Sequence, residues 1–312
     1  MIDIFTLFSR TKVIKISIFF ALVILIPLTS SAQLRSSYWT KYKNEIFFGA
    51  SASTYLGDLG GGIESGKHSL ADLNMAATKF AFSAGFRTKL TEMVTFRMDL
   101  AYGQCSGADS LTENLGRKSR NLSFKTTYYT FSPLIEVYVI PESYGRGASP
   151  ISAYISTGLR FMYFNPQAEY QGTWYNLQPL GTEGQLVNSG STSYSQFTVG
   201  LPFIAGFKFA LPSKGGKSGA WSLGVEASAT WLMTDYFDDV STTYADPEAI
   251  KQISGEIGAI LADRRANGGQ SAGGIRGNPQ YNDWYGLLTV MVSKQLYTKS
   301  RRRKSPNRGS YF

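Results

Sequence analysis

Two residue types that carry much protein chemistry are almost missing from this chain, whose 312 residues include one cysteine and one histidine. The single cysteine, Cys105, excludes an intrachain disulfide, and its place at a predicted strand end indicates a bystander rather than a nucleophile. The single histidine, His68, leaves little for a zinc site or for histidine-based catalysis. The sequence therefore favours a non-enzymatic protein without a cofactor or a metal site.

Charged residues are also scarce, at 17% of the chain against roughly 25% in a typical soluble domain. Beyond the N-terminus, no apolar stretch approaches the length of about 18 residues that a membrane-spanning helix needs. If the mature protein lies in a membrane, it must cross as a closed β-barrel, because barrels and helices alone satisfy all backbone hydrogen bonds there.

The N-terminus has the pattern of a secretory signal peptide. Basic Arg10, Lys12 and Lys15 precede an apolar run of 13 residues from Ile16 to Leu28, and small residues follow at 30–32. This pattern predicts a signal peptide over residues 1–32 with cleavage before Gln33. The alternative is an uncleaved membrane anchor, for which the run is short.

The net charge of +9 is concentrated at the C-terminal end. The segment 298–312 contains six basic residues and no acidic one, so the body over 33–297 is close to neutral. This distribution argues against a nucleic-acid-binding face. We interpret 298–312 as a basic tail that binds an acidic partner or anionic headgroups, or is simply a solvated end. The partner-binding candidates are Arg301, Arg302, Arg303 and Lys304.

Alternation of apolar and polar residues, the mark of strands with unlike faces, is what the chain has in abundance. Eight segments show it, most of them at least as long as the 9–11 residues that a tilted membrane strand needs. They are 45–56, 79–87, 93–104, 125–140, 151–164, 194–210, 221–231 and 283–297. Long connections follow the odd segments and short ones follow the even segments, which is typical of an outer-membrane barrel.

These features predict an all-β fold, an eight-stranded antiparallel up-and-down transmembrane β-barrel over 33–297 with both termini in the periplasm of a Gram-negative bacterium. The alternative is a soluble sandwich or lipocalin-like barrel with the apolar set inside. So many large aromatic side chains would not fit inside eight strands.

The polar face of the predicted strands carries charge. Because eight strands leave room only for side chains, we expect a salt-bridged lumen without an open pore. A proton or ion relay is the alternative. Glu226 should point toward a base such as Arg97 or Arg160. The predicted lumen charge network consists of Arg87, Arg97, Asp99, Glu136, Arg160, Lys208 and Glu226.

Aromatic residues near the strand ends could form two interfacial girdles against outer-membrane lipid. Trp221 and Trp231 stand ten residues apart, which is about 33 Å along an untilted strand and roughly 23 Å at a 45° tilt. The candidates are Trp221, Trp231 and Trp284, with Tyr55, Tyr102, Tyr128, Tyr163, Tyr194 and Tyr297.

Two features stand out in the last long connection. The stretch "DYFDDVSTTYADP" (235–247) could supply calcium ligands, but it lacks a regular ligand spacing, and turn and loop packing is the favoured interpretation. The following residues predict a short helix capped by Asp246, with Pro247 in the first turn and Gly268 at the end. Its stripe of Ile250, Ile253, Ile257 and Leu261 should pack on the loops.

Several loop sequences carry a resemblance to a known family. They are "GDLGG" (57–61), "RNLSF" (120–124), "NPQAEYQGTWYNLQPLGTEGQ" (165–185), "DYFDDVSTTYADP" (235–247) and "RGNPQYNDWY" (276–285). Together they resemble the PorG family of outer-membrane barrels in the type IX secretion system, over about residues 35–297. The resemblance implies a barrel that holds a periplasmic ring of PorK-like and PorN-like proteins at the outer membrane, in protein secretion and gliding motility.

Two other functions remain open from the sequence. One is an outer-membrane hydrolase that uses His68 with Ser69, although no orienting acid stands at a readable spacing. The other is a surface-binding barrel whose long external loops meet a ligand.

Overall fold

The computed structural model describes residues 43–57, 59, 77–112, 114–143, 149–187, 193–212, 218–265 and 272–296. Several predicted features lie outside these residues. They are the signal peptide 1–32, His68 with Ser69, Tyr297, and the tail with Arg301, Arg302, Arg303 and Lys304.

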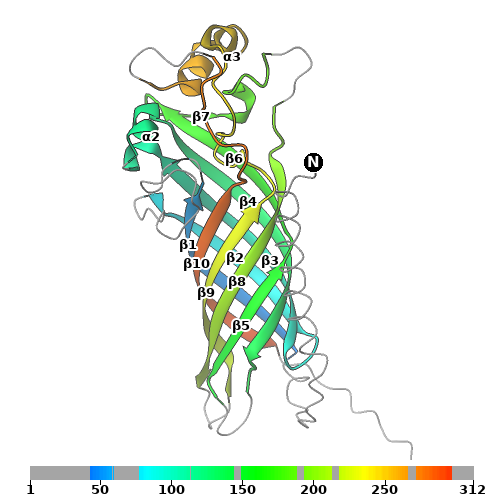
Figure 1. Ribbon diagram of the computed structural model, residues 1–312. Helices are drawn as coiled ribbons and strands as arrows, with labels where there is room; N and C mark the ends of the chain where they lie inside the picture. Colours follow the sequence, from blue (N-terminus) through cyan, green and yellow to red (C-terminus); the bar gives the residue numbers. More distant parts are fainter. Residues whose placement is uncertain are drawn as a thin grey trace, which may run out of the picture. The chain divides into compact units, whose positions relative to one another are not determined.

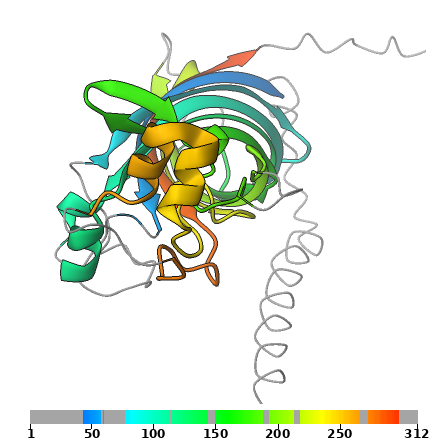
Figure 2. The same ribbon diagram turned by 90° about the horizontal axis from the view of Figure 1, so that it is seen from above.

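The described chain forms a closed antiparallel barrel, as predicted (Figures 1 and 2). Its last strand pairs with its first over 13 residues, from Asn44 opposite Leu296 to Leu56 opposite Trp284, which leaves no open sheet edge. The barrel strands are β1 (Asn44–Leu56), β2 (Lys79–Lys89), β3 (Val94–Ala108), β4 (Ser123–Ile140), β5 (Ile151–Gly158), β6 (Arg160–Tyr170), β8 (Phe197–Pro212), β9 (Ser218–Leu232) and β10 (Trp284–Leu296).

β5 and β6 together make the single fifth strand of the prediction, so the ring has eight strands. The register with β4 and β8 is the same on both sides of Leu159. The interruption falls where the neighbouring strands contain Pro133 and Pro202. Proline has no backbone N–H to donate, so the hydrogen-bond ladder weakens at this level without a change of register.

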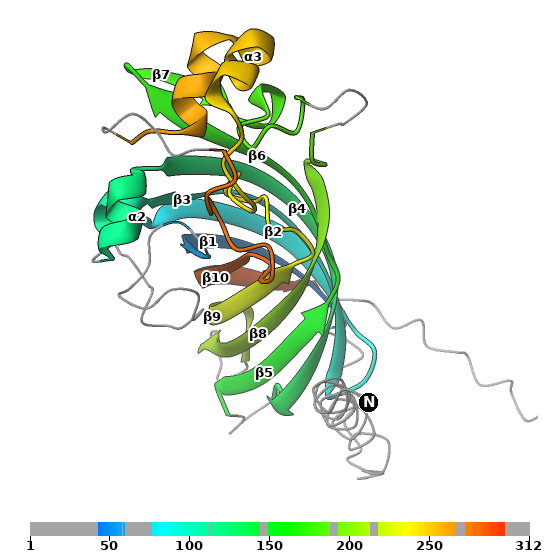
Figure 3. The same ribbon diagram turned by 45° about the horizontal axis from the view of Figure 1, so that its top comes forward.

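Several strands reach further at the end with the long connections than the sequence pattern indicated. β3 and β4 pair as far as Ala108 and Ser123, and β6 continues to Tyr170 before it turns back into the short β7 (Thr173–Asn176). β6 and β7 project beyond the barrel rim in Figures 1 and 3. We call this end of the barrel the mouth and the other end the short-turn end.

Short helices gather at the mouth (Figure 3). They are η4 (Asp109–Leu111), α2 (Leu115–Arg120), η5 (Gln178–Leu180) and α3 (Pro247–Ala262). None of the helices within the described ranges is long and apolar enough to cross a membrane.

α3 is the predicted loop helix, and it starts as expected. Asp246 caps it by accepting the Glu248 N–H at 3.1 Å, and Pro247 occupies the first turn. The helix kinks at Gly255, where φ is +74°, and it ends at Ala262, before the predicted end near Gly268. Ile250 and Leu261 are buried as expected, whereas Ile253 is half exposed and does not pack on the loops as predicted.

The barrel has its apolar side chains outside and its charges inside. Phe48, Phe80 and Leu100 expose 64%, 79% and 61% of their surface, whereas Arg87, Arg97 and Glu136 are buried. A lipocalin-like barrel would show the opposite arrangement. The polarity therefore removes the soluble alternative in which the apolar set fills the interior.

Three predicted girdle residues lie elsewhere. Tyr55 and Tyr128 point inward and are buried in an aromatic cluster at the mouth. Tyr194 packs against Tyr236 in the loops at 4.6 Å between ring centroids, so it is also not part of a girdle. The strands of Tyr55 and Tyr128 continue past the apolar band into the mouth, where an inward aromatic side chain meets loops instead of charges.

Candidate functional site

The lumen is filled by a charge-balanced network. Among the described residues, five basic and five acidic side chains line it between the mouth and the short-turn end. They are Arg87, Lys89, Arg97, Arg160 and Lys208, against Glu45, Asp99, Glu136, Glu142 and Glu226. Seven of the ten are the residues that alternation predicted to face inward. Balance matters here because an unpaired buried charge would cost several kcal/mol.

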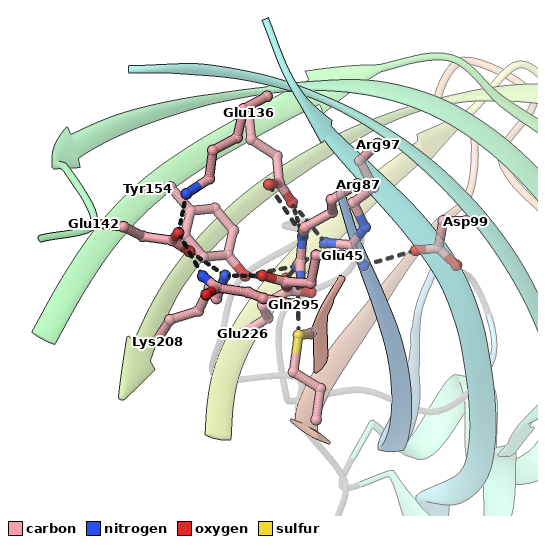
Figure 4. A network of polar contacts seen from close by, with 12 residues as sticks. Glu45, Arg87, Arg97, Asp99, Glu136, Glu142, Tyr154, Lys208, Glu226 and Gln295 are labelled. Atoms are coloured by element: carbon pink, nitrogen blue, oxygen red, sulfur yellow. Dashed lines mark hydrogen bonds and ion pairs between the residues drawn. The ribbon is translucent and has the colours of Figure 1, made fainter. Parts of the chain in front are cut away.

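Arg87 on β2 stands at the centre of the network (Figure 4). Its guanidinium donates to both oxygens of Glu136 at 2.9 and 3.1 Å and to Glu45 at 2.9 Å. It also donates to Glu226 at 3.0 Å. The planar fork of arginine suits such multiple recognition of carboxylates. Arg87 thereby joins β2 to β1, β4 and β9 across the barrel.

Arg97 on β3 shares the same carboxylates. It donates to Glu226 at 2.6 Å, to Glu136 at 3.2 Å and to Asp99 at 2.8 Å. Glu226 also accepts a hydrogen bond from Tyr154. The glutamate that interrupts an otherwise apolar and small-residue strand is thus a central acceptor of the lumen.

An aromatic ring completes the centre. Phe47 is fully buried, with the guanidinium carbons of Arg87 and Arg97 at 4.4 and 4.5 Å from its ring centroid. Both contacts are cation–π interactions in a desolvated site. Gly85 makes room for this ring, because a Cβ at that position would lie 2.3 Å from it.

At the short-turn end, a residue from a turn enters the network. Glu142 follows β4 and forms ion pairs with both Lys89 and Lys208, and it accepts from Gln295 at 3.1 Å. Lys208 also pairs with Glu45 at 2.6 Å. Glu142 therefore ties its turn to β2, β8 and β10 and closes this end of the lumen.

Toward the mouth the network changes from carboxylates to hydroxyls. Arg160 donates to Ser132 at 2.9 Å, to Thr230 at 2.8 Å and to Tyr285 at 3.0 Å. No carboxylate of the described residues forms an ion pair with it. Of the two bases predicted as partners of Glu226, Arg97 forms the ion pair and Arg160 does not. A cavity of about 20 Å³ lies beside Arg97, Asp99 and Arg160. That volume holds about one water molecule and not an organic substrate.

Sequence reasoning missed three members of the network. Glu45 shares its face with Ser51 and Ser53, so strict alternation along β1 would have identified it. Lys89 lies two residues beyond the predicted end of its strand, on the face of Arg87. Glu142 belongs to no strand, and no pattern in the sequence shows that its turn folds back into the lumen.

The mouth is closed by the acidic loop. Phe237 of "DYFDD" is fully buried against Tyr55, Tyr128, Phe164 and Tyr285, with ring centroids 5.7–6.1 Å apart. Its backbone is held on both sides, because its N–H donates to Asp283 at 2.9 Å and its carbonyl accepts from Thr126 at 2.5 Å. The loop is a plug whose centre is an aromatic side chain.

The aspartates around Phe237 have protein partners. Tyr55 donates to Asp238 at 2.6 Å and to Asp283 at 2.5 Å. Asp239 accepts from Tyr194 at 2.7 Å and from Thr182, and Asp246 caps α3. These bonds are the loop-packing role favoured from the sequence. No group of three or more His, Cys, Asp or Glu within the described ranges is placed to hold a metal ion.

A second set of ion pairs joins the loops to one another. Arg276 is buried and pairs with Glu183 at 3.0 Å and with Asp239 at 3.6 Å. Burial lowers the pKa of Arg276, but the carboxylates of Glu183 and Asp239 outweigh it and raise the pKa overall. Burial raises the pKa of Asp239 to about 6, against the opposing effects of Arg276, Thr182 and Tyr194.

The three tryptophans named from the sequence lie on the outer face at the two ends of the barrel. Trp231 and Trp284 are opposite each other at the mouth end of β9 and β10. Trp221 lies at the short-turn end, where the ammonium of Lys294 sits 5.1 Å from its ring centroid. Cys105 points inward and is fully buried, with its sulfur 3.0 Å from the Ser53 hydroxyl.

The chain thus has the fold of a small eight-stranded up-and-down barrel, the architecture of several outer-membrane proteins. No protein family and no curated protein matches the sequence. Neisserial surface protein A is a similar solved structure, with 11% identity and a TM-score of 0.38 over 81% of this chain and 97% of that one.

Ail of Yersinia pestis, solved with the heparin analogue sucrose octasulfate, is 9% identical with a TM-score of 0.36 over 81% of this chain and 98% of its own. The N-terminal barrel of Pseudomonas aeruginosa OprF is 11% identical with a TM-score of 0.31, over 80% of this chain and 98% of its own.

Proposed function

We propose that this chain is a non-enzymatic outer-membrane β-barrel of a Gram-negative bacterium. The observation that carries the proposal is the inverted polarity of the barrel, with phenylalanine and leucine side chains exposed outside and paired charges buried inside. Water would penalise that outer surface, whereas lipid would cover it. The filled lumen leaves the two ends and the outer wall as the surfaces on which the protein acts.

At finer detail, we propose that the barrel anchors the type IX secretion and gliding machinery by holding PorK-like and PorN-like ring proteins. The loop sequences that resemble the PorG family support this role. Both ends of the barrel chain also lie at the short-turn end, because Asn44 and Leu296 are paired there. In the proposed orientation this end faces the periplasm, and the basic tail 298–312 follows directly on the strand that ends there.

Gel mobility tests the membrane barrel. Membrane barrels stay folded in cold detergent and migrate differently after boiling, since a closed sheet without edges resists unfolding. We expect a heat-dependent mobility shift and retention in the membrane pellet after carbonate treatment. An unchanged mobility together with full carbonate extraction would rule out the membrane barrel.

In-cell cross-linking tests the anchoring role. We expect ring proteins to co-purify with the full chain and to be reduced when Arg301, Arg302, Arg303 and Lys304 are all changed to Gln. A Thr173→Gln variant on the opposite end is the matched control and should recover the ring normally. Recovery of the barrel without ring proteins would contradict the anchoring role and leave the membrane barrel intact.

A surface-binding barrel is the second candidate, because the long connections form a packed cap with buried ion pairs. Deletion of 246–267 distinguishes the two. Loss of surface binding with normal secretion would favour this candidate, whereas impaired secretion would favour the anchor.

A further inference from the structure

One sheet face outside the barrel is left open by the described residues, apart from Ser123, which accepts from Arg264 at 2.8 Å. The ends of β4 and β6 and the whole of β7 form an extension of the barrel wall past the rim, which we call the flap (residues 123–127, 165–170 and 173–176; Figure 3). The inner face of the flap is occupied, since Ala168 and Tyr175 pack with Leu261 and Ile257 of α3. The outer face carries Lys125, Asn165, Gln167, Glu169, Trp174 and Asn176.

Side-chain amides on the outer face form a chain. Asn176 accepts from Asn165 at 2.9 Å and from Gln167 at 2.8 Å. Asn165 in turn accepts from Gln196 at 3.1 Å, and Gln196 accepts from the Tyr163 hydroxyl at 3.2 Å. Each amide has two N–H groups and an oxygen, so the chain fixes their orientation while Asn165 and Gln167 each use only one of their two N–H groups within it.

A cation and an aromatic ring stand beside the amides. The ammonium of Lys125 lies 3.5 Å from the ring centroid of Trp174, and Trp174 remains 43% exposed. Lys125, Gln167 and Asn176 are directly opposite one another on three adjacent strands. One ligand could therefore contact the cation and both amides at once. Glu169, opposite Trp174, supplies the one acidic group of this face.

The flap stands at a defined height above the outer apolar surface. Tyr102, Tyr129, Tyr163 and Phe197 are in register on β3, β4, β6 and β8, with successive ring centroids 5.2, 6.4 and 5.0 Å apart. This row is the aromatic girdle at the mouth. Lys125 lies four residues beyond Tyr129 on the same face, roughly 13 Å along the strand. At a 45° tilt this is a height of about 9 Å above the girdle, which in an outer membrane is the level of the headgroups.

We propose that the outer face of the flap binds the phosphorylated sugar headgroup of an outer-leaflet glycolipid. The proposal rests on the outer-membrane location proposed above. Oriented amides match vicinal sugar hydroxyls, an exposed indole ring matches the C–H face of a sugar, and Lys125 matches a phosphate. The headgroup of phosphatidylglycerol offers a phosphate and one glycerol diol, but no sugar ring to stack on Trp174 and no further hydroxyls for the amides of Asn165, Gln167 and Asn176. Because the outer face of the flap continues the surface of the aromatic girdle at the mouth, it faces the lipids of the leaflet that the girdle contacts.

Retention of lipids by the full-length protein, immobilised in mixed detergent micelles, tests the proposal. The probes are rough-type lipopolysaccharide, the same lipopolysaccharide after dephosphorylation, its lipid-free core oligosaccharide, and phosphatidylglycerol. We expect lipopolysaccharide to be retained at least tenfold over phosphatidylglycerol. Lys125→Gln should weaken retention about fivefold for intact lipopolysaccharide and little for the dephosphorylated form, as removal of one surface cation implies.

Asn176→Ala with Trp174→Ala should weaken retention of both forms about tenfold, because it removes the sugar contacts. The matched control is Lys294→Gln with Trp221→Ala, the other lysine–tryptophan pair on the described outer wall, at the short-turn end. It should leave retention unchanged.

Equal retention of phosphatidylglycerol and lipopolysaccharide, or equal loss in the control, would overturn the proposal. So would equally tight binding of the lipid-free oligosaccharide, which would identify a soluble glycan as the ligand. The heat-dependent gel shift is measured on the same samples. If the shift is present and lipopolysaccharide is not preferred, only the flap proposal fails; if the shift is absent, the membrane barrel fails and the flap proposal fails with it.

Discussion

At the scale of single residues, the lumen network depends on carboxylates that are each shared by two arginines. Glu226 accepts from Arg87, Arg97 and Tyr154, and Glu136 accepts from both arginines. In this buried site Glu136 and Glu226 each stabilise both arginines, and each arginine is held by carboxylates from several strands. Removal of one member therefore leaves its partners buried with unbalanced charge. The cost of this unbalanced charge is larger than the net contribution of any single ion pair to stability.

Glu226→Gln tests the shared acceptor. The substitution keeps the side-chain shape but leaves Arg87 and Arg97 with one carboxylate fewer, so the free energy of unfolding should fall by about 3–5 kcal/mol. Urea unfolding in detergent, followed by tryptophan fluorescence, measures it. Ser228→Ala, on the same strand and face, is the control and should change stability by less than about 0.5 kcal/mol. If the Glu226→Gln protein is as stable as the control, a shared role for this carboxylate is contradicted.

Asp239 predicts a pH dependence for the loop cap. Its pKa is raised to about 6 from 3.8, so the folded state binds its proton more tightly than the unfolded state. This contribution to stability is present below about pH 3.8 and is lost as the pH rises through 6. At most it amounts to about 3 kcal/mol.

The comparison of wild type with Asp239→Asn isolates this effect from the titration of Glu183 and other carboxylates. We expect the stability of wild type minus that of the variant to rise as the pH is lowered from 7 to 4. Urea midpoints at several pH values measure it. A difference that is constant or falls over this range would show that burial does not dominate at Asp239.

At the scale of elements, the acidic loop has a different role in the fold from the one that its composition suggests. As a sequence it offers four aspartates that could surround a cation, but in the fold it delivers Phe237 into the mouth. The aspartates hold this arrangement by accepting from Tyr55 and Tyr194 and by capping α3. Alternation cannot reveal such a plug, because the loop has no period and its partners come from four strands.

Phe237→Ala tests the plug. The substitution leaves a cavity between Tyr55, Tyr128, Phe164 and Tyr285, so the loop cap should lose about 3–5 kcal/mol of stability. Limited proteolysis of the folded protein should cut the 233–246 segment much faster. Tyr281→Ala removes a half-exposed aromatic from a neighbouring loop and should not change the cutting rate. Because the strands remain paired, the heat-dependent gel shift should persist, and its loss would mean that the plug is needed by the barrel itself.

At the scale of the whole molecule, the distribution of apolar and polar side chains between the outer wall and the interior indicates which environment surrounds the barrel. The outer wall presents aromatic and branched apolar side chains on all eight strands, between tryptophans at the two ends, while the interior is polar. The apolar side chains of the outer wall are therefore not buried by the protein itself, and only an apolar surrounding can remove them from water. A lipid environment supplies that partner, and water does not.

Val290→Arg tests the environment. Val290 faces outward at the middle of β10, opposite Ala50 and Val225. In a bilayer, arginine at mid-depth should cost about 2–4 kcal/mol and lower the yield of folding into vesicles. Thr173→Arg, on the exposed β7, is the control and should fold normally. Equal folding of both variants would indicate that this wall faces water.

The sequence by itself determined the eight segments of the ring and the alternation of their two faces, because a period of two is a local property of the chain that needs no tertiary contact. It also determined that charges such as Arg87, Asp99 and Glu226 share the inner face. Only the tertiary structure decided which charges meet, that Glu142 leaves its turn to close one end, and that Tyr55 and Tyr128 hold Phe237 at the other. The physical reason is that contacts between side chains across a barrel depend on the register of the strands and on turns that fold back into the lumen. Both bring together residues far apart in the chain, and no local pattern records them.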